Sequence, residues 1–386
     1  METTPQTVRE TLAKLRELPP IPVERRLAAL GAFWQKVPLA PPPETGAFPW
    51  AQVRRGIAAL AASAPHCSEP VELGKPGVLA LILAGNTPLL AWPTLHYCVL
   101  LGIPVFIKQS RDETVWTRHF VETLTEIDAE VAALLHLDLF PGMVDERMLS
   151  LLTIADATIA YGSDETLEAL WPHLYWKPFL PFGHATSIGF WCDGSSQYRE
   201  GGEGFARDVL MYDQQGCLSP QTIFVDWGNH GAISAGQLLA GELAKVVDDL
   251  KVPPVTDLAI AREVREVADI ARFTPTDYVI QDSHLRWTVI YGTQPKILSH
   301  GTGHGIVRIV PTYHRFMRHL PFILGSLQGK VSSVGVAGDM SQELGMALEA
   351  VGVSRICRAG EMQTPPLDWK NGGVDLRAWL VESLAS

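Results

Sequence analysis

The sequence is poor in cysteine and in positive charge, and both shortages exclude classes of protein. Its five cysteines, among 386 residues, form no Cys-x-x-Cys pair and no regular ladder of spacings. This argues against a disulfide framework and a zinc finger, so we expect reduced thiols, a cytoplasmic setting and no metal site. Lysine and arginine together number 31 against 42 aspartates and glutamates, which gives a net charge of −11. A chain this acidic gains little from phosphate backbones, so nucleic acid is not an expected partner.

Charged side chains are also absent from residues 76–107, and the N-terminal segment lacks the apolar run of a signal peptide. A hydropathy scan would flag the uncharged stretch as a membrane segment. However, Gly85-Asn86-Thr87-Pro88, Pro93 and Gly102-Ile103-Pro104 interrupt it, and a spanning helix tolerates few such breaks. We therefore expect strand, loop, helix and strand here, and no membrane span.

Apolar runs and helical periodicity alternate along the chain. Residues 77–84 and 103–107 are continuous apolar runs of strand length, as in strands buried on both faces. A buried helix over 88–101, ended by Gly102, separates them and predicts a βαβ unit with parallel strands. Further helices are expected at 6–36 (in two pieces, divided by prolines), 50–63, 112–126, 143–152, 164–171, 204–213, 233–250 and 258–271, and further strands at 157–161, 186–191, 222–226, 287–291 and 306–310.

This alternation predicts an α/β protein of two domains, which suits a chain of this length. Residues 1–200 are expected to form N-terminal helices and a doubly wound, Rossmann-like domain with a parallel sheet. A glycine-rich stretch near residue 200 predicts a junction, and a second α/β domain follows over 201–345. The C-terminal segment, 346–386, is expected to return to the first domain.

Cys217 is the main candidate nucleophile. Glycine precedes it and Pro220 follows, which predicts a tight turn between a helix and a strand. Such a turn can present a thiol beside backbone N–H groups that stabilise an anion. The alternative is a small buried hydrophobic residue, as expected of Cys98 and Cys192, which lie in apolar runs.

Polar residues follow both strands of the predicted βαβ unit, where a parallel sheet binds its ligands. Asn86 follows the first strand and is either an oxyanion donor or a residue that makes the turn. Lys108 and Arg111 follow the second strand and suit a nucleotide phosphate or ribose, with Ser110 between them. Ser110 and Glu113 also have the spacing of a helix capping box, which leaves both cations available.

Three further segments carry weaker signals. Gly162 and Ser163 join a strand to a helix, where free N–H groups can bind phosphate. His184 has the chemistry of a general acid or base, although a lone histidine is more often structural. The segment Gly301–Gly305 is dense in glycine and suits a cleft lining, but it lacks the strand-to-helix context of a dinucleotide motif.

These motifs together resemble one family. They are Gly85–Pro88, Ile107–Glu113, Tyr161–Thr166, the cysteine string Arg207–Gln221 and the tail Gly352–Trp369. The set resembles the aldehyde dehydrogenase superfamily and, within it, the LuxC-type acyl-CoA reductases, the fatty-acid reductases of bacterial bioluminescence and their non-luminous relatives. The resemblance runs from about residue 76 to the C-terminus, and the cysteine string is its most specific part.

The resemblance implies a role for each matching position. Cys217 matches the acylated nucleophile, and Asn86 matches the amide that holds the oxyanion together with the Cys217 backbone N–H. Lys108 matches the lysine that contacts the adenosine ribose, and Gly162-Ser163 matches the turn that approaches the pyrophosphate. The first domain would then be the NAD(P)-binding domain, and the second would be the catalytic domain.

Two departures from the superfamily's pattern bear on the chemistry. The segment Phe182–Ala185, with His184, stands where hydrolytic aldehyde dehydrogenases place the glutamate that activates water. The absence of this glutamate suits an enzyme whose acyl thioester is exchanged with another thiol and is not hydrolysed. Arg111 stands where a ribose-binding glutamate often lies, and an arginine there accommodates a 2′-phosphate, which favours NADPH over NADH, although Asp112 and Glu113 beside it weaken this inference.

The expected activity is reduction of an acyl thioester, from acyl-CoA or an acyl-protein, to an aldehyde through an acyl group on Cys217. A homo-oligomer, in the first instance a dimer, is implied by the resemblance alone. Two alternatives remain open: an acyl-phosphate or short-chain acyl-CoA reductase on the same scaffold, and a binding protein that has lost catalysis.

Overall fold

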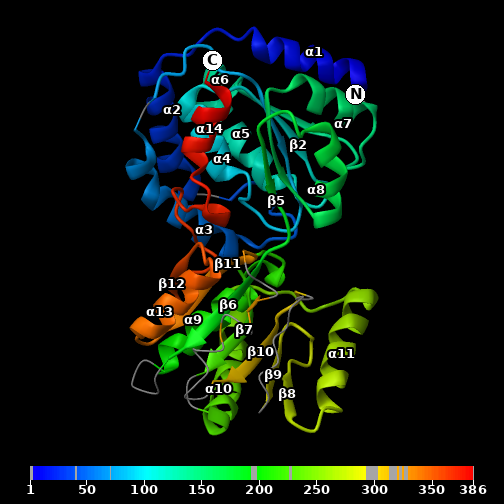
Figure 1. Cartoon of the computed structure of the whole chain (residues 1–386), viewed down its shortest axis with the longest axis vertical. Helices are drawn as coiled ribbons and strands as arrows, with labels where there is room; N and C mark the ends of the chain where they lie inside the picture. Colours follow the sequence, from blue (N-terminus) through cyan, green and yellow to red (C-terminus); the bar gives the residue numbers. More distant parts are fainter. Residues whose placement is uncertain are drawn as a thin grey trace. The chain divides into compact units, whose positions relative to one another are not determined.

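A computed structural model of the chain describes residues 3–39, 41–69, 71–192, 198–225, 228–292, 303–312, 320, 324–325 and 329–385. The chain divides into two compact units (Figure 1). Unit 1 comprises Met1–His184, Pro366–Lys370 and Val374–Ser386, and unit 2 comprises Ala185–Pro365 and Asn371–Gly373.

Unit 1 is built on a five-stranded sheet in which every pairing is parallel. Its strands are β1 (Leu79–Ile82), β2 (Val105–Gln109), β3 (Leu135–Leu139), β4 (Ala157–Tyr161) and β5 (Phe179–Phe182), in the order β3-β2-β1-β4-β5. The predicted βαβ unit is confirmed, since β1 and β2 are parallel neighbours. The order reverses between β1 and β4, and ligands of doubly wound sheets bind at the carboxyl ends of strands at such a switch point.

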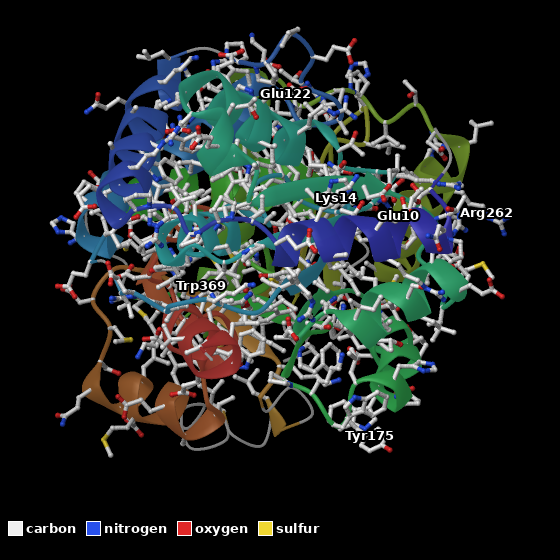
Figure 2. The ribbon with its side chains drawn as sticks, turned by 90° about the horizontal axis from the view of Figure 1, so that it is seen from above. Glu10, Lys14, Glu122, Tyr175, Arg262 and Trp369 are labelled. Atoms are coloured by element: carbon white, nitrogen blue, oxygen red, sulfur yellow. The ribbon has the colours of Figure 1, made fainter. Side chains whose placement is uncertain are left out.

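Helices surround this sheet, and their burial follows their sequence pattern. They are α1 (Pro5–Arg16), α2 (Val23–Lys36), α3 (Trp50–Ser63), α4 (Trp92–Leu101), α5 (Val115–Ile127), α6 (Ala129–Ala132), α7 (Glu146–Ile154), α8 (Asp164–Leu170) and α14 (Leu376–Leu384). On α1, Val8, Leu12 and Leu15 are buried while Glu10 and Lys14 lie on the exposed face (Figure 2). This is the apolar stripe expected of an amphipathic helix.

The uncharged stretch 76–107 forms β1, α4 and β2, as the sequence predicts. Helix α4 is short and nearly every residue in it is buried, so its lack of charge reflects a core position. It ends at Gly102, whose φ of 71° is in the left-handed region that glycine adopts without strain. In the part of the chain that the structure describes, no helix has both the length and the apolar character needed to cross a bilayer.

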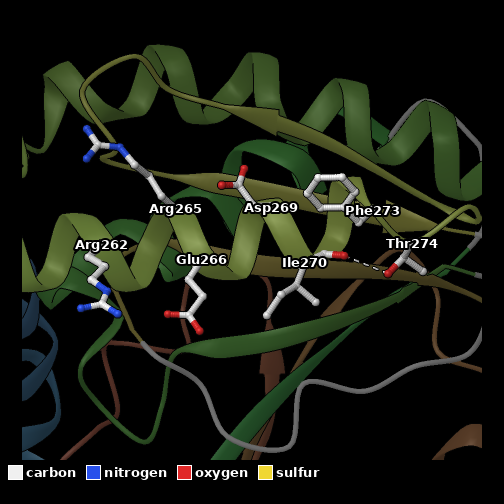
Figure 3. A pocket seen from close by; sticks show the side chains of 7 residues that line it. All are labelled: Arg262, Arg265, Glu266, Asp269, Ile270, Phe273 and Thr274. Atoms are coloured by element: carbon white, nitrogen blue, oxygen red, sulfur yellow. Dashed lines mark hydrogen bonds between the residues drawn. The ribbon is translucent and has the colours of Figure 1, made fainter.

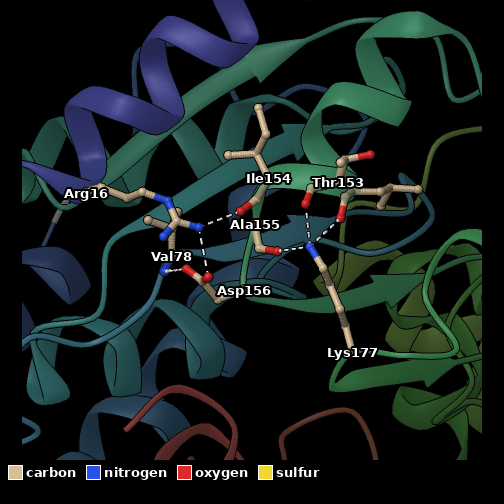
Figure 4. A network of polar contacts seen from close by, with 8 residues as sticks. Arg16, Val78, Thr153, Ile154, Ala155, Asp156 and Lys177 are labelled. Carbon is tan, nitrogen blue, oxygen red and sulfur yellow. Dashed lines mark hydrogen bonds and ion pairs between the residues drawn. The ribbon is translucent and has the colours of Figure 1, made fainter. Parts of the chain in front are cut away.

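Polar contacts at the C-terminal end of α7 connect this helix to α1 and to the residue before β1 (Figure 4). Lys177 Nζ donates to the carbonyls of Leu152, Thr153 and Ala155, which are end-of-helix acceptors without intrahelical partners. Asp156 accepts from the Val78 N–H at 2.7 Å and from Arg16 at 2.8 Å. The network gives hydrogen-bond donors to the carbonyls at the end of α7, and it fixes the position of the backbone just before β1.

Unit 2 contains a seven-stranded sheet that is parallel except at one edge. Its strands are β6 (Thr186–Trp191), β7 (Pro220–Val225), β8 (Asp277–Gln281), β9 (Thr288–Gly292), β10 (Ile306–Pro311), β11 (Val331–Ala337) and β12 (Ile356–Arg358), in the order β12-β11-β6-β7-β10-β9-β8. Its longer helices are α9 (Tyr198–Leu210), α10 (Gly228–Asp249), α11 (Leu258–Arg272) and α13 (Gln342–Val351). The predicted α/β class therefore holds in both units.

The structure departs from the sequence expectations in several places. The strands β3, β5, β8, β11 and β12 were not predicted. Polar residues interrupt β3, β5 is only four residues long and contains Pro181, and serine and glycine interrupt the apolar residues of β11. The helix expected from residue 112 begins at Val115, and Ser110 does not cap it. Glu113 takes that role, since its carboxylate accepts from the Trp116 N–H at 2.6 Å, so the predicted capping box is wrong.

The predicted domain boundaries at residues 200 and 345 also differ from the observed division. Strand β6 pairs with β7 and β11, so unit 2 begins before this strand and not after it. The chain re-enters unit 1 at Pro366, after β12 has completed the second sheet. The assignment of NAD(P) binding and catalysis to separate domains stays a prediction.

A buried ion pair joins the edge strand β8 to β10. Arg308 Nη2 lies 2.6 Å from Asp277 Oδ1, and their side chains are 3% and 1% exposed. We predict that Asp277→Ala lowers the free energy of unfolding by about 3–5 kcal/mol, because it leaves a buried guanidinium without its counter-charge. The exposed pair Arg272–Asp269 is the control, and Asp269→Ala should cost less than about 1 kcal/mol in the same urea titration. Equal losses in the two variants would contradict this account.

Candidate active site

The turn before Cys217 has an unusual backbone. Helix α9 ends at Leu210, and the next residues include Tyr212, Asp213 and Gln214 with φ of 57°, 52° and 56°. Residues other than glycine occupy this left-handed region at a cost on the order of 1–3 kcal/mol each. Three such residues in a row reverse the chain, so that Cys217 lies three residues before β7.

The segment that leads into β10 holds this turn in place. The His304 N–H donates to the Asp213 carbonyl at 2.8 Å, and Gln214 Nε2 donates to the carbonyls of Pro220 and Ile306. Gly303, with φ of 73°, lies against the Gln215 side chain, and a Cβ at this position would come within 2.3 Å of Gln215 Nε2. The described part of the predicted glycine-rich segment therefore holds the turn before Cys217 in place. The segment's first residues, 301 and 302, lie outside the described part.

Two serines contact Cys217 from neighbouring strands. Ser332 Oγ donates to Cys217 Sγ at 3.7 Å, and Ser187 Oγ donates to the Cys217 carbonyl at 2.6 Å. Ser187 in turn accepts from the Ser333 N–H at 3.1 Å. The registers of β6 with β11 and of β6 with β7 both shift at this level, and such bulges re-aim side chains. One hydroxyl thus contacts the sulfur and the other fixes the backbone of Cys217.

The environment of Cys217 distinguishes it from most of the other cysteines. Burial raises the pKa of its thiol, while the Ser332 hydroxyl and the residue's own backbone N–H lower it. Cys67, Cys98 and Cys192 are buried, as expected for the latter two, whereas Cys217 and Cys357 are partly exposed. Burial raises the pKa of Cys357 to about 11, which leaves it a weaker candidate.

A buried carboxylate also takes part in the contacts around the turn. Asp208 on α9 is fully buried and accepts from the N–H groups of Gly360 and Met362 at 2.6 and 3.1 Å. Its burial raises its pKa to about 7. Gln363 Nε2 donates both to the Asp208 carbonyl and to Ser219 Oγ, two residues after Cys217. The segment 360–363, part of the C-terminal motif, thereby holds the far end of the turn.

The structure also brings together a histidine and a carboxylate that the sequence did not pair. His304 Nδ1 lies 2.6 Å from Asp213 Oδ2, and His304 Nε2 lies 3.5 Å from Gln215 Nε2. The Asp213 carboxylate raises the pKa of His304, and Glu263 and Asp257 add to this effect, while burial opposes it. His304 therefore contacts the turn at Asp213 and at Gln215, which lie four and two residues before Cys217. The glycine-dense setting of His304 was visible in the sequence, but its partner was not.

In unit 1, the predicted site residues gather at the carboxyl ends of the sheet. Gly85, in the loop after β1 that carries Asn86, packs so closely that a Cβ would come within 2.5 Å of Ser110 Oγ. Lys108 is 5% exposed, and its ammonium lies 5.9 Å from the centre of the Phe140 ring. Burial lowers the pKa of Lys108, and the positive charge of Arg111 lowers it further. The two cations therefore repel each other, and an anion would relieve this.

Ser163 and His184 lie at the carboxyl ends of β4 and β5. Ser163 caps α8 by accepting from the Thr166 N–H at 3.3 Å, and the Gly162 N–H donates to the Phe182 carbonyl. His184 is exposed, and its N–H donates to Asp164 in the first turn of α8. His184 therefore groups with the predicted cofactor residues of unit 1, whereas Cys217 and His304 belong to unit 2.

Two cavities are lined by described residues. One of about 700 Å³ runs along α11 and is lined by Arg262, Arg265, Glu266, Asp269, Ile270, Phe273 and Thr274 (Figure 3). A second, of about 750 Å³, lies in unit 1 beside the proline-rich segment 19–22. Neither is lined by Cys217 or by any other predicted site residue. Among the described residues, no cluster of histidine, cysteine, aspartate and glutamate has the arrangement of a metal site.

The chain is similar in sequence to one family of reductases. A family model described as Acyl-CoA reductase (LuxC) matches residues 72–377. A long-chain acyl-protein thioester reductase of Aliivibrio fischeri is 27% identical over 154 residues, which are 38% of this chain and 32% of that protein. The long-chain acyl-protein thioester reductase 2 of Photobacterium leiognathi is 26% identical over 147 residues, 37% of this chain and 30% of that protein. Each alignment thus covers well under half of the relative.

Solved structures establish the fold. A glyceraldehyde-3-phosphate dehydrogenase of Methanocaldococcus jannaschii, solved with NADP, superposes with a TM-score of 0.73 at 13% identity, over 98% of this chain and 92% of that one. An NAD-dependent aldehyde dehydrogenase of Sinorhizobium meliloti gives a TM-score of 0.73 at 15% identity, over 99% and 86%. The predicted aldehyde dehydrogenase-like fold is confirmed.

The contact between Ser332 and Cys217 makes a direct prediction about thiol reactivity. Ser332→Ala removes a hydrogen bond that stabilises the thiolate, so the pKa of Cys217 should rise. At pH 8, alkylation of Cys217 by iodoacetamide should slow about fivefold, the equivalent of about 1 kcal/mol. Peptide mass spectrometry in a Cys357→Ser background measures the rate. Ser354→Ala, which removes a hydroxyl bonded to the Ser332 carbonyl, is the control. An unchanged rate in Ser332→Ala would show that the contact does not tune the thiol.

Proposed function

Because the chain belongs to the acyl-CoA reductase (LuxC) family, we propose that it reduces an acyl thioester to an aldehyde with NADPH, through an acyl group carried on Cys217. The observation that carries the proposal is the setting of Cys217. The residue is partly exposed, its sulfur contacts a serine hydroxyl, and it follows a strained turn that Gln214, His304 and Gln363 hold by hydrogen bonds. A structural cysteine needs none of these features, whereas an acylated nucleophile needs a fixed position and an anion-stabilising surround.

The residues of unit 1 fit an anionic dinucleotide. Lys108 and Arg111 are mutually repelling cations at the carboxyl end of β2, next to the switch point of the sheet. We propose that Lys108 and Ser110 hold the ribose region and that Gly162 and Ser163 allow close approach of the pyrophosphate. Asp164 and Glu165 in the first turn of α8 oppose a phosphate there, so the attraction must come chiefly from the cations.

NADPH is the proposed reductant because Arg111 offers a guanidinium for a 2′-phosphate, and NADH is the less favoured alternative. The bound nicotinamide supplies the hydride. A dehydrogenase of the same fold was solved with NADP, and another is described as NAD-dependent, so the fold accepts either nucleotide.

The chain's own residues account for the rest of the chemistry. Cys217 attacks the thioester carbonyl, and the departing thiol leaves an acyl-enzyme. The Cys217 N–H and the Asn86 amide are the proposed oxyanion donors, each typically worth about 3–4 kcal/mol. His184 stands where hydrolytic relatives activate water with glutamate, so the acyl-enzyme persists until it is reduced. Collapse of the resulting thiohemiacetal releases the aldehyde and restores the thiolate.

The acyl donor is proposed to be acyl-CoA or an acyl-protein thioester. The family description names acyl-CoA, and both curated relatives are described as acyl-protein thioester reductases. Both donors present the same thioester to Cys217. A homodimer and a cytoplasmic location stay predictions.

Acylation of Cys217 is predicted to occur without any cofactor. Incubation with acyl-CoAs of several chain lengths should add one acyl mass to the intact protein, and Cys217→Ser should abolish both the adduct and aldehyde formation. Cys357→Ser, the other partly exposed cysteine, should retain them. Acyl phosphates tested in parallel show whether the chain accepts this alternative class of substrate. Normal turnover by Cys217→Ser would falsify the mechanism.

Nucleotide preference is predicted to depend on Arg111. Arg111→Glu should lower kcat/KM for NADPH relative to NADH roughly tenfold, as expected from losing about 1.4 kcal/mol of charge-assisted interaction. Arg118→Glu makes the same charge change on the exposed side of α5 and should leave the ratio unaltered. If both variants shift the ratio equally, or neither does, Arg111 does not select the nucleotide.

A further inference from the structure

We infer that His304, oriented by Asp213, is the proton donor to the sulfur that leaves when Cys217 is acylated. This inference rests on the proposed function and deepens it, because it assigns the one proton that acylation must deliver. In that step a bond forms between Cys217 Sγ and the acyl carbon, and the bond from this carbon to the donor's sulfur breaks. The departing thiolate takes a proton from His304, and solvent returns the proton to the imidazole afterwards.

The geometry favours His304 because only one of its two ring nitrogens, Nδ1, contacts the Asp213 carboxylate. Nδ1 pairs with Asp213 at 2.6 Å, which orients the ring, and Nε2 lies beside Gln215, two residues before the nucleophile. The His304 side chain is 11% exposed, so it is largely buried but still reaches solvent. An acid–base histidine held by a carboxylate is a recurrent arrangement in covalent catalysis.

The charges around His304 suit a donor more than an acceptor. Three carboxylates act on its charge: Asp213, which contacts it from the turn, and more weakly Asp257 at the N-cap of α11 and Glu263 on α11. Together they raise the pKa of the imidazole, so its protonated fraction at neutral pH exceeds that of an ordinary histidine. Donor capacity is then present below the His304 pKa and is lost as the pH rises through it.

Other described groups beside the turn are less suited to this role. Asp208 is fully buried, and its two oxygens accept from the N–H groups of Gly360 and Met362. Ser332 contacts the Cys217 sulfur, but a hydroxyl is far too weak an acid to protonate a thiolate. The N–H of His184 donates to Asp164 at the start of α8, whereas His304 contacts the turn before Cys217. We therefore assign delivery of this proton to His304, and the catalytic role predicted for His184 stays a separate prediction.

The test compares two thioesters of one acyl group that differ in the basicity of the departing thiol. Octanoyl-N-acetylcysteamine releases a basic alkyl thiolate, whereas S-phenyl thiooctanoate releases a thiolate stable enough to leave unprotonated. Intact mass spectrometry follows acylation of Cys217 in the full chain, with no nucleotide added. The observable is the ratio of the aryl to the alkyl rate. Changes in the nucleophile or its turn affect both rates and cancel in this ratio.

His304→Asn is the informative variant, because asparagine tolerates the left-handed backbone at this position, where φ is 56°. The alkyl rate should fall about 100-fold while the aryl rate changes little, so the ratio rises about 100-fold. His284→Asn, an exposed histidine of the same unit, should leave the ratio at the wild-type value. Asp213→Asn should lower the pH above which the alkyl rate declines, since it removes the main cause of the raised His304 pKa.

An unchanged ratio in His304→Asn overturns the inference, whether both rates fall together or neither falls. Equal loss would mean that His304 only holds the turn. If the wild-type chain forms no acyl-enzyme with either thioester, the proposed function itself fails and the inference falls with it. Acylation of the wild type therefore separates the two failures.

Discussion

The site in unit 2 depends on a stretch of backbone that is unfavourable by itself. Tyr212, Asp213 and Gln214 are all left-handed, and no glycine relieves the strain. The turn persists because hydrogen bonds from several directions over-determine it: Gln214 bonds the starts of β7 and β10, and His304 bonds Asp213 through both backbone and side chain. Strain of this kind is found where a fold must hold a reactive group in one position. Here it holds the sulfur of Cys217.

Two chemical environments follow from the two sheets. In unit 1, the carboxyl ends of parallel strands gather Lys108 and Arg111, a pair of cations that an anion would stabilise. In unit 2, the amino ends of β6, β7, β10 and β11 gather hydroxyls, a thiol and a histidine–carboxylate pair. The first environment suits a phosphorylated nucleotide. The second suits acyl transfer between sulfurs, a reaction that needs a fixed nucleophile and one proton but no activated water.

Sequence reasoning predicted the parts of this arrangement that depend on local pattern. The βαβ unit, the termination of α4 at Gly102 and the position of Cys217 before β7 all follow from apolar runs and from glycine and proline placement. It did not predict the edge strands β3, β5, β8 and β12 or the buried strand β11, which become strands by pairing with segments elsewhere in the chain. It also missed Ser187, Ser332 and the Asp213–His304 pair. These contacts join residues separated by 30 to 115 positions, and a single sequence carries no signal for such pairings.

The central claim is that the acyl group is reduced while it is bound to Cys217. The most direct measurement isolates the acyl-enzyme by gel filtration and then adds NADPH alone, in the absence of any acyl donor. The account predicts a single turnover in which one equivalent of NADPH is oxidised for each acyl-enzyme, with release of the aldehyde and loss of the adduct mass. An adduct that survives unchanged in NADPH, or that leaves as the carboxylic acid without nucleotide oxidation, would contradict it.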